Sequence, residues 1–179
     1  MAISRKLVEK MGGTITFESE KGVGTTFVIR VSFKIDPDAD KREEQKDVSE
    51  KSIKGLHILL AEDNELNMEI AEFMLQNEGA DVIKAWNGQE AVELFRNSEP
   101  GEFDVILMDI MMPVMNGYEA TKMIRSLDRE DAKTIPIIAM TANAFTEDRI
   151  RAKAAGMDEH VAKPVDVELL IKVIHKLVK

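Results

Sequence analysis

Five side chains able to take part in catalysis directly follow short apolar runs of the chain. They are Glu62, Asp63, Asp109, Thr141 and Lys163. If they met in one crevice, the three carboxylates would repel one another. Such repulsion either raises the pKa of one of the carboxyl groups or requires a bound cation. Because all the donor atoms would be oxygens, with no His or Cys among them, the set favours a hard ion, and Mg²⁺ is the natural candidate.

The same set has the parts for transfer of a phosphoryl group to a carboxylate. Asp109 would attack phosphorus in line, while the metal and Lys163 neutralise charge on the equatorial oxygens. Thr141 would donate a hydrogen bond to one of those oxygens. The product would be an aspartyl phosphate.

Each residue taken singly also has a plainer interpretation. Glu62 and Asp63 are suited to capping the helix that follows them, Thr141 to a turn, and Lys163 to a solvated surface. Asp109 is harder to dismiss, because it interrupts the apolar run VILMDIMMP, where a charge is costly. The agreement of four strand ends favours the site.

Alternating short apolar runs and amphipathic stretches predict the elements that must position this set. The runs are typical of strands in a parallel sheet covered on both faces: 56–61, 81–85, 105–108, 135–140 and 160–162. The other stretches are typical of helices: 65–78, 89–97, 118–127, 146–155 and 166–178. The first helix has one apolar face, made of Leu66, Ile70, Phe73 and Met74. Five β-α units predict an open doubly wound α/β sheet, which binds ligands at the carboxyl ends of its strands.

The charge of the chain is uneven along its length. Residues 1–35 carry six Lys/Arg and three Asp/Glu, giving +3; residues 36–54 carry five and seven, giving −2; residues 55–179 carry 13 and 23, giving −10. The middle stretch has few large apolar residues, so we predict a solvated linker over 36–54, with an exposed helix capped at Asp40 as the alternative. The first segment predicts one helix, 3–11, and a β-hairpin, too little for a core of its own.

Composition excludes several classes of function. The formal net charge of −9 argues against a nucleic-acid-binding surface. No apolar stretch reaches the roughly 18 residues of a membrane span. The absence of Cys excludes thiolate catalysis and fits a reducing compartment, so we expect a cytoplasmic location.

Four separated motifs resemble, in order and spacing, the receiver domain of two-component response regulators. They are AEDN at 61–64, MDIMMPVMNG at 108–117, AMTANA at 139–144 and AKPV at 162–165. The resemblance covers residues 55–179. It implies a flavodoxin-like sheet with strand order 2-1-3-4-5, Asp109 as phosphoacceptor, and a Mg²⁺ site made by Glu62, Asp63, Asp109 and the backbone carbonyl of Met111.

The resemblance also implies how such a domain switches. Thr141 and Lys163 would contact the phosphoryl group, and Thr141 would move toward it. Many members have Tyr or Phe where this chain has His160, the second predicted switch residue. A cis peptide is expected before Pro164, since X-Pro bonds adopt that form at least cost.

The opening segment, residues 1–35, resembles the last helix and hairpin of the ATP-binding domain of histidine kinases. Together the two resemblances suggest the C-terminal part of a hybrid histidine kinase. The glycine-rich box that precedes this segment in the family is missing, so we do not expect this chain to bind ATP. We expect a phosphodonor that bears a phosphohistidine, either a histidine kinase or a phosphotransfer protein. A homodimer through the N-terminal segment is one arrangement that the sequence allows.

Two other functions stay open at this point. A docking module that works without phosphate is suggested by His160 and by the docking-type N-terminal segment. A metal-dependent phosphatase with an aspartyl intermediate is weaker, because such enzymes usually have a second Asp two residues after the nucleophile, where this chain has Met111.

Overall fold

The chain divides into two compact units, Met1–Val48 and Ser49–Lys179. The computed structural model describes residues 5, 8–22, 24–32, 52–141 and 146–178. Most of the predicted linker, including the alternative helix at Asp40, lies outside the described residues. Of the helix predicted over 3–11, Arg5 and residues 8–11 are described; Arg5 and residues 8–10 are helical, whereas Met11 lies in a turn.

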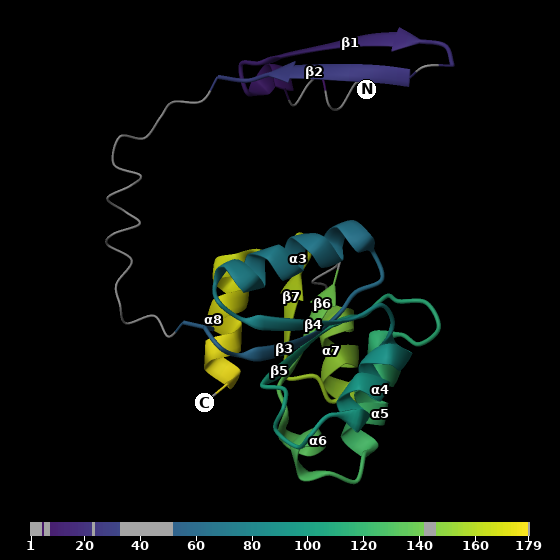
Figure 1. The fold of residues 1–179 in the computed structure, drawn as a ribbon, viewed down its shortest axis with the longest axis vertical. Helices are drawn as coiled ribbons and strands as arrows, with labels where there is room; N and C mark the ends of the chain where they lie inside the picture. Colours follow the sequence, from purple (N-terminus) through teal and green to yellow (C-terminus); the bar gives the residue numbers. More distant parts are fainter. Residues whose placement is uncertain (1–4, 6–7, 23, 33–51, 142–145, 179) are drawn as a thin grey trace. The chain divides into compact units, whose positions relative to one another are not determined.

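The N-terminal unit contains the predicted β-hairpin. β1 (Thr14–Glu20) pairs antiparallel with β2 (Gly24–Arg30), as Figure 1 shows. The register places Phe17 opposite Phe27, with ring centroids 5.9 Å apart, and both side chains are exposed. A homodimer through this unit stays a prediction.

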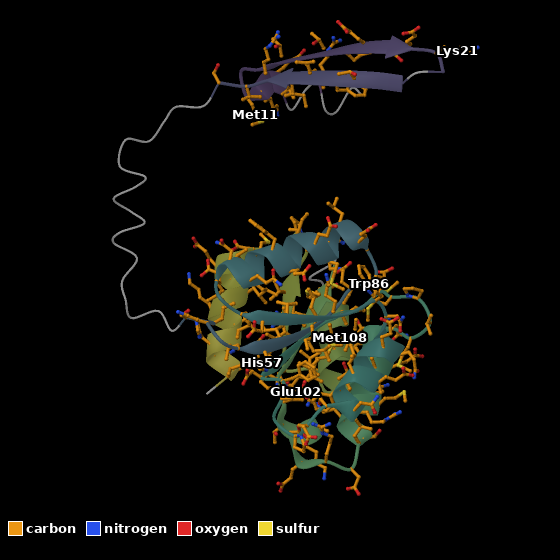
Figure 2. The ribbon with its side chains drawn as sticks, in the orientation of Figure 1. Met11, Lys21, His57, Trp86, Glu102 and Met108 are labelled. Carbon is orange, nitrogen blue, oxygen red and sulfur yellow. The ribbon has the colours of Figure 1, made fainter. Side chains whose placement is uncertain are left out.

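The second unit is built on a five-stranded sheet. Its strands are β3 (His57–Ala61), β4 (Asp81–Ala85), β5 (Val105–Asp109), β6 (Ile137–Thr141) and β7 (Glu159–Ala162). They lie in the order β4-β3-β5-β6-β7 with every neighbouring pair parallel, which is the predicted order 2-1-3-4-5. His57 begins β3 and Trp86 follows β4, so these two side chains mark opposite ends of the sheet in Figure 2. The doubly wound α/β fold is confirmed.

Helices cover both faces of this sheet. They are α3 (Glu65–Asn77), α4 (Gly88–Asn97), α5 (Gly117–Ser126), α6 (Glu130–Thr134), α7 (Thr146–Ala155) and α8 (Val167–Leu177). One core cluster packs α3 and α8 against the sheet, and a second packs α4, α5 and α7 against the other face (Figure 1). Among the helices described, none is both long enough and apolar enough to cross a membrane.

The helix α3 turns a different face to the sheet from the one that its sequence suggests. The side chains that it buries are Met68, Ala71 and Leu75. Three of the four residues of the predicted apolar face, Leu66, Ile70 and Phe73, are exposed instead. The helix is therefore apolar on two sides, and one of them is exposed.

Two features of the second unit differ from the prediction. The helix α6 was not predicted, because it has only five residues and its N-cap residue, Arg129, makes no side-chain capping hydrogen bond. The packed unit also begins before residue 55, because Ile53 is 1% exposed and belongs to the core cluster under α3 and α8.

Candidate functional site

The predicted site residues gather at the carboxyl ends of four strands. Glu62 and Asp63 follow β3, Asp109 ends β5, Thr141 ends β6, and Lys163 follows β7. Backbone hydrogen bonds continue the sheet into the site, because the Lys163 N–H donates to the Thr141 carbonyl at 2.7 Å. The parallel sheet therefore brings together residues that lie up to about a hundred positions apart in the sequence.

Lys163 joins two of the carboxylates. Its Nζ donates to Asp109 Oδ2 at 2.8 Å and also to Glu62 Oε2. The Lys163 side chain is only 18% exposed, so the interpretation of this residue as a solvated surface lysine is wrong. Lys163 therefore places a buried positive charge beside the Asp109 carboxylate.

Burial and charge shift the pKa values of this pair. Burial raises the pKa of Asp109, and the charge of Glu62 adds to that effect, although the hydrogen bond from Lys163 opposes it. Burial alone would lower the pKa of Lys163, but its hydrogen bonds to Asp109 and Glu62 outweigh that effect and leave the pKa raised. Lys163 is therefore a cation at neutral pH.

Glu62 is 2% exposed, and both of its oxygens accept hydrogen bonds. Oε2 accepts from Lys163, while Oε1 accepts from the Asn67 side-chain amide at 3.0 Å and from the Asn64 backbone N–H at 3.4 Å. A carboxylate buried so deeply needs such donors. Sequence reasoning missed Asn67, although the spacing N-E-L-N at the start of a helix was a visible signal.

Asparagine side chains fix the turns that lead from the strands into the helices. The N-cap of α3 is Asn64, whose Oδ1 accepts from the Asn67 backbone N–H at 3.0 Å. Asn87 and Asn116 cap α4 and α5 in the same way. The interpretation of Glu62 or Asp63 as the helix cap is therefore wrong.

The loop after β5 holds Asp109 in place. The Met111 backbone N–H donates to Asp109 Oδ1 at 3.3 Å, and the Gly117 N–H donates to the Ile110 carbonyl at 3.0 Å. Val114 lies in the same loop, between Met111 and Gly117. Its φ of 67° is in the left-handed region, which a β-branched residue rarely adopts. A Cβ added at Gly117 would lie 2.2 Å from the Asp109 carbonyl oxygen.

The carboxylates suit a divalent cation. One oxygen from each of Glu62, Asp63 and Asp109 lies within 4.8 Å of the other two. Mg²⁺ prefers oxygen ligands and keeps several waters, and the exposed Asp63 leaves room for them. Both oxygens of Glu62 and both oxygens of Asp109 already accept hydrogen bonds from the protein, whereas Asp63 is exposed. The Met111 carbonyl as a further ligand stays a prediction.

The predicted switch residues lie in two different environments. Thr141 is 6% exposed, whereas His160 is half-buried within β7, where it pairs in register with Ala139. The structure therefore brings Thr141 to the edge that carries Asp109, and the switch role of His160 stays a prediction. The peptide bond between Lys163 and Pro164 is cis, as predicted.

The doubly wound parallel sheet, with an acidic cluster and a buried lysine at its carboxyl edge, places the protein in the flavodoxin-like class of α/β proteins. The chain matches the response regulator receiver domain family over residues 58–175. It belongs to that family.

Curated relatives include a sensor protein and a hybrid histidine kinase. The chain is 36% identical over 177 residues to the aerobic respiration control sensor protein ArcB of Escherichia coli K12, covering 98% of this chain and 22% of that protein. It is 38% identical over 120 residues to hybrid signal transduction histidine kinase I of Dictyostelium discoideum, covering 66% of this chain and 7% of that protein. The chain thus spans less than a quarter of the length of either.

Solved receiver domains share the fold. The receiver domain of sensor histidine kinase PA1611 from Pseudomonas aeruginosa, with magnesium coordinated in its active site cleft, is 38% identical with a TM-score of 0.62, over 69% of this chain and 97% of that one. The receiver domain of Ssk1 from Saccharomyces cerevisiae, solved with the histidine phosphotransfer protein Ypd1, is 30% identical with a TM-score of 0.64, over 72% of this chain and 92% of that one.

Proposed function

We propose that the second unit accepts a phosphoryl group from a phosphohistidine onto Asp109, in the presence of Mg²⁺. The observation that carries this proposal is the buried Lys163 Nζ at 2.8 Å from Asp109 Oδ2, inside a cluster of three carboxylates. In the reaction, the nitrogen–phosphorus bond of the donor breaks and its electron pair returns to the imidazole. An oxygen–phosphorus bond forms at the Asp109 carboxylate.

The residues around Asp109 have distinct roles in that transfer. Lys163 shifts its hydrogen bond from the Asp109 carboxylate to the phosphoryl oxygens and neutralises their negative charge. The Thr141 hydroxyl donates a hydrogen bond to the phosphoryl group at the end of β6. Asp63 and Asp109 would hold Mg²⁺, with Glu62 beside them. When bound, the metal supplies positive charge to the transferring group.

The exposed face of α3 supports a protein donor. Leu66, Ile70 and Phe73 recur at helical spacing on this helix, which starts two residues after Asp63, and Phe73 is 72% exposed. An apolar stripe of this kind on a surface favours contact with a partner. The partner that we propose is a histidine phosphotransfer protein. The solved complex of Ssk1 with Ypd1 supports that class of partner for this chain.

A substitution on this face separates docking from chemistry. We expect Phe73→Asp to slow transfer from a phosphorylated histidine phosphotransfer protein by tenfold or more, because it puts a charge in the contact. Labelling by acetyl phosphate should not change. Ile150→Asp on α7 is the matched control, since Ile150 is also exposed and apolar, and it should not slow either reaction. Equal rates for all three proteins would refute docking through α3.

The reaction itself is tested with acetyl phosphate. We expect the chain to gain the mass of one phosphoryl group when Mg²⁺ is present, and Asp109→Asn to gain none. Labelling that persists in Asp109→Asn would refute the site. An unlabelled wild type, under conditions that label a control receiver, would favour the phosphate-independent docking module. A cytoplasmic location stays a prediction.

A further inference from the structure

Asn67 is placed to act on the site from the first turn of α3. Its side-chain Nδ2 donates to Glu62 Oε1 at 3.0 Å. Its backbone N–H is already used by the Asn64 cap, at 3.0 Å. The two interactions use different atoms, so the side-chain amide is not needed to start the helix.

This amide begins a continuous chain of hydrogen bonds that ends at the phosphoacceptor. Asn67 donates to one oxygen of Glu62, whose other oxygen accepts from Lys163. Lys163 donates in turn to Asp109 Oδ2 at 2.8 Å. Without the amide, the one remaining donor to Glu62 Oε1 among the described residues is the Asn64 backbone N–H, at 3.4 Å.

We infer that Asn67 is a positioning residue for phosphoryl transfer: its amide fixes the Glu62 carboxylate, and Glu62 in turn holds Lys163 beside Asp109. This inference rests on the proposed function. A carboxylate without a fixed partner on one oxygen rotates, and Lys163 then loses the anchor that orients it. A neutral donor is required, because a second carboxylate at position 67 would repel Glu62 and draw Lys163 away from Asp109.

Asn67 is not a packing residue, because it is exposed and belongs to neither core cluster. Its replacement therefore leaves the core of the unit intact. Asn77 is the matched control, since it is an exposed asparagine of the same helix at the end far from Asp63.

The test compares Asn67→Ala, Asn67→Asp and the control Asn77→Ala with the wild type, using acetyl phosphate at saturating Mg²⁺. We expect labelling of Asp109 to be roughly tenfold slower in Asn67→Ala, the usual effect of losing a hydrogen bond to a charged group. Asn67→Asp should be slower still, although aspartate has nearly the shape of asparagine. Asn77→Ala should match the wild type.

Metal affinity provides a readout that damage to the fold would not reproduce. We expect Asn67→Asp to bind Mg²⁺ more tightly than the wild type in NMR titrations, because it adds a negative charge beside the acidic cluster, even though it is phosphorylated more slowly. Loss of Mg²⁺ affinity together with loss of rate would indicate general damage and overturn the inference.

A double-mutant cycle tests whether the effect of Asn67 passes through Glu62. In a Glu62→Gln background, Asn67→Ala should cause no further loss of rate, because its effect passes through Glu62. In the metal-free protein, Glu62→Gln should also shift the NMR resonance of the Asn67 side-chain amide. Wild-type rates in both Asn67 variants, or a full further loss in the double variant, would overturn the inference. A wild type that is not labelled at Asp109 would refute the proposed function, and this role with it, even if the amide shift confirmed the contact.

Discussion

Gly117 begins α5 and lies against the backbone of Asp109. A Cβ at this position would lie 2.2 Å from the Asp109 carbonyl oxygen and 3.0 Å from Met108 Cγ. Relief of that overlap requires a shift of about 1 Å between β5 and α5, since non-bonded atoms prefer about 3.5 Å. We therefore expect Gly117→Ala to displace Asp109.

The free energy of this change can be worked from two opposing effects. Overpacking of this kind costs about 1–3 kcal/mol. The replacement of glycine by alanine in a helix returns up to about 1 kcal/mol. The free energy of unfolding should therefore fall by about 1–2 kcal/mol. The rate of Asp109 phosphorylation should fall about a hundredfold, the effect of a 1 Å misplacement at a reacting centre.

Urea unfolding and labelling by acetyl phosphate measure the two effects. Gly101→Ala is the control, because Gly101 has φ of +79° and nothing within 4 Å of an added Cβ. It should lower stability by about 1 kcal/mol through backbone strain and leave the labelling rate unchanged. A Gly117→Ala variant that is more stable than the wild type and equally fast would refute the reasoning, because helix propensity alone predicts that result.

Further predictions concern stability, each measured by urea or acid unfolding. Val114→Asn should raise the free energy of unfolding by about 1 kcal/mol, because asparagine tolerates the left-handed backbone that Val114 adopts with φ of 67°; a loss would contradict the strain. Arg129→Ala should lower it by about 2–3 kcal/mol, because the guanidinium lies 4.4 Å from the Phe95 ring centroid and donates to the Phe95 carbonyl at 2.5 Å; an unchanged value would show that these contacts add nothing. A hydrogen bond from Arg129 lowers the pKa of Asp131 from 3.8 to about 2. This carboxylate therefore stabilises the fold above pH 4, and its contribution is lost as the pH falls from about 4 to 2. Asp131→Asn should remove that part of the acid dependence. Leu75→Ala should cost about 2–5 kcal/mol, since Leu75 is fully buried, and a smaller loss would mean that the core relaxes around the cavity.

The fold and the residues of the site could be predicted because each reactive side chain directly follows an apolar run that forms a strand. Asp109 interrupts an apolar run, and such a run forms a central parallel strand with its polar residue at the carboxyl end. Lys163 could be assigned to the same edge for the same reason, because it follows β7. Their separation of 2.8 Å depends on the register between strands, which sequence patterns do not specify.

Other features escaped sequence reasoning because their signals are short or ambiguous. The helix α3 has two apolar sides, and periodicity alone does not show which one packs on the sheet. Asn67 acts through a single side-chain hydrogen bond to Glu62. The spacing of residues in the sequence does not show which group such an amide contacts or at what distance. The need for glycine at 117 arises from a close approach of β5 to α5, which only the folded backbone reveals.

Direct transfer between proteins tests the central claim most directly. A histidine phosphotransfer protein, phosphorylated on its histidine with radiolabelled phosphate, is mixed with the chain and Mg²⁺, and the label on each protein is followed with time. We predict that the label leaves the donor and appears on the wild-type chain as an acid-stable, base-labile acyl phosphate, and that Asp109→Asn receives none. A donor that keeps its label with the wild type, or equal transfer to Asp109→Asn, would contradict the account.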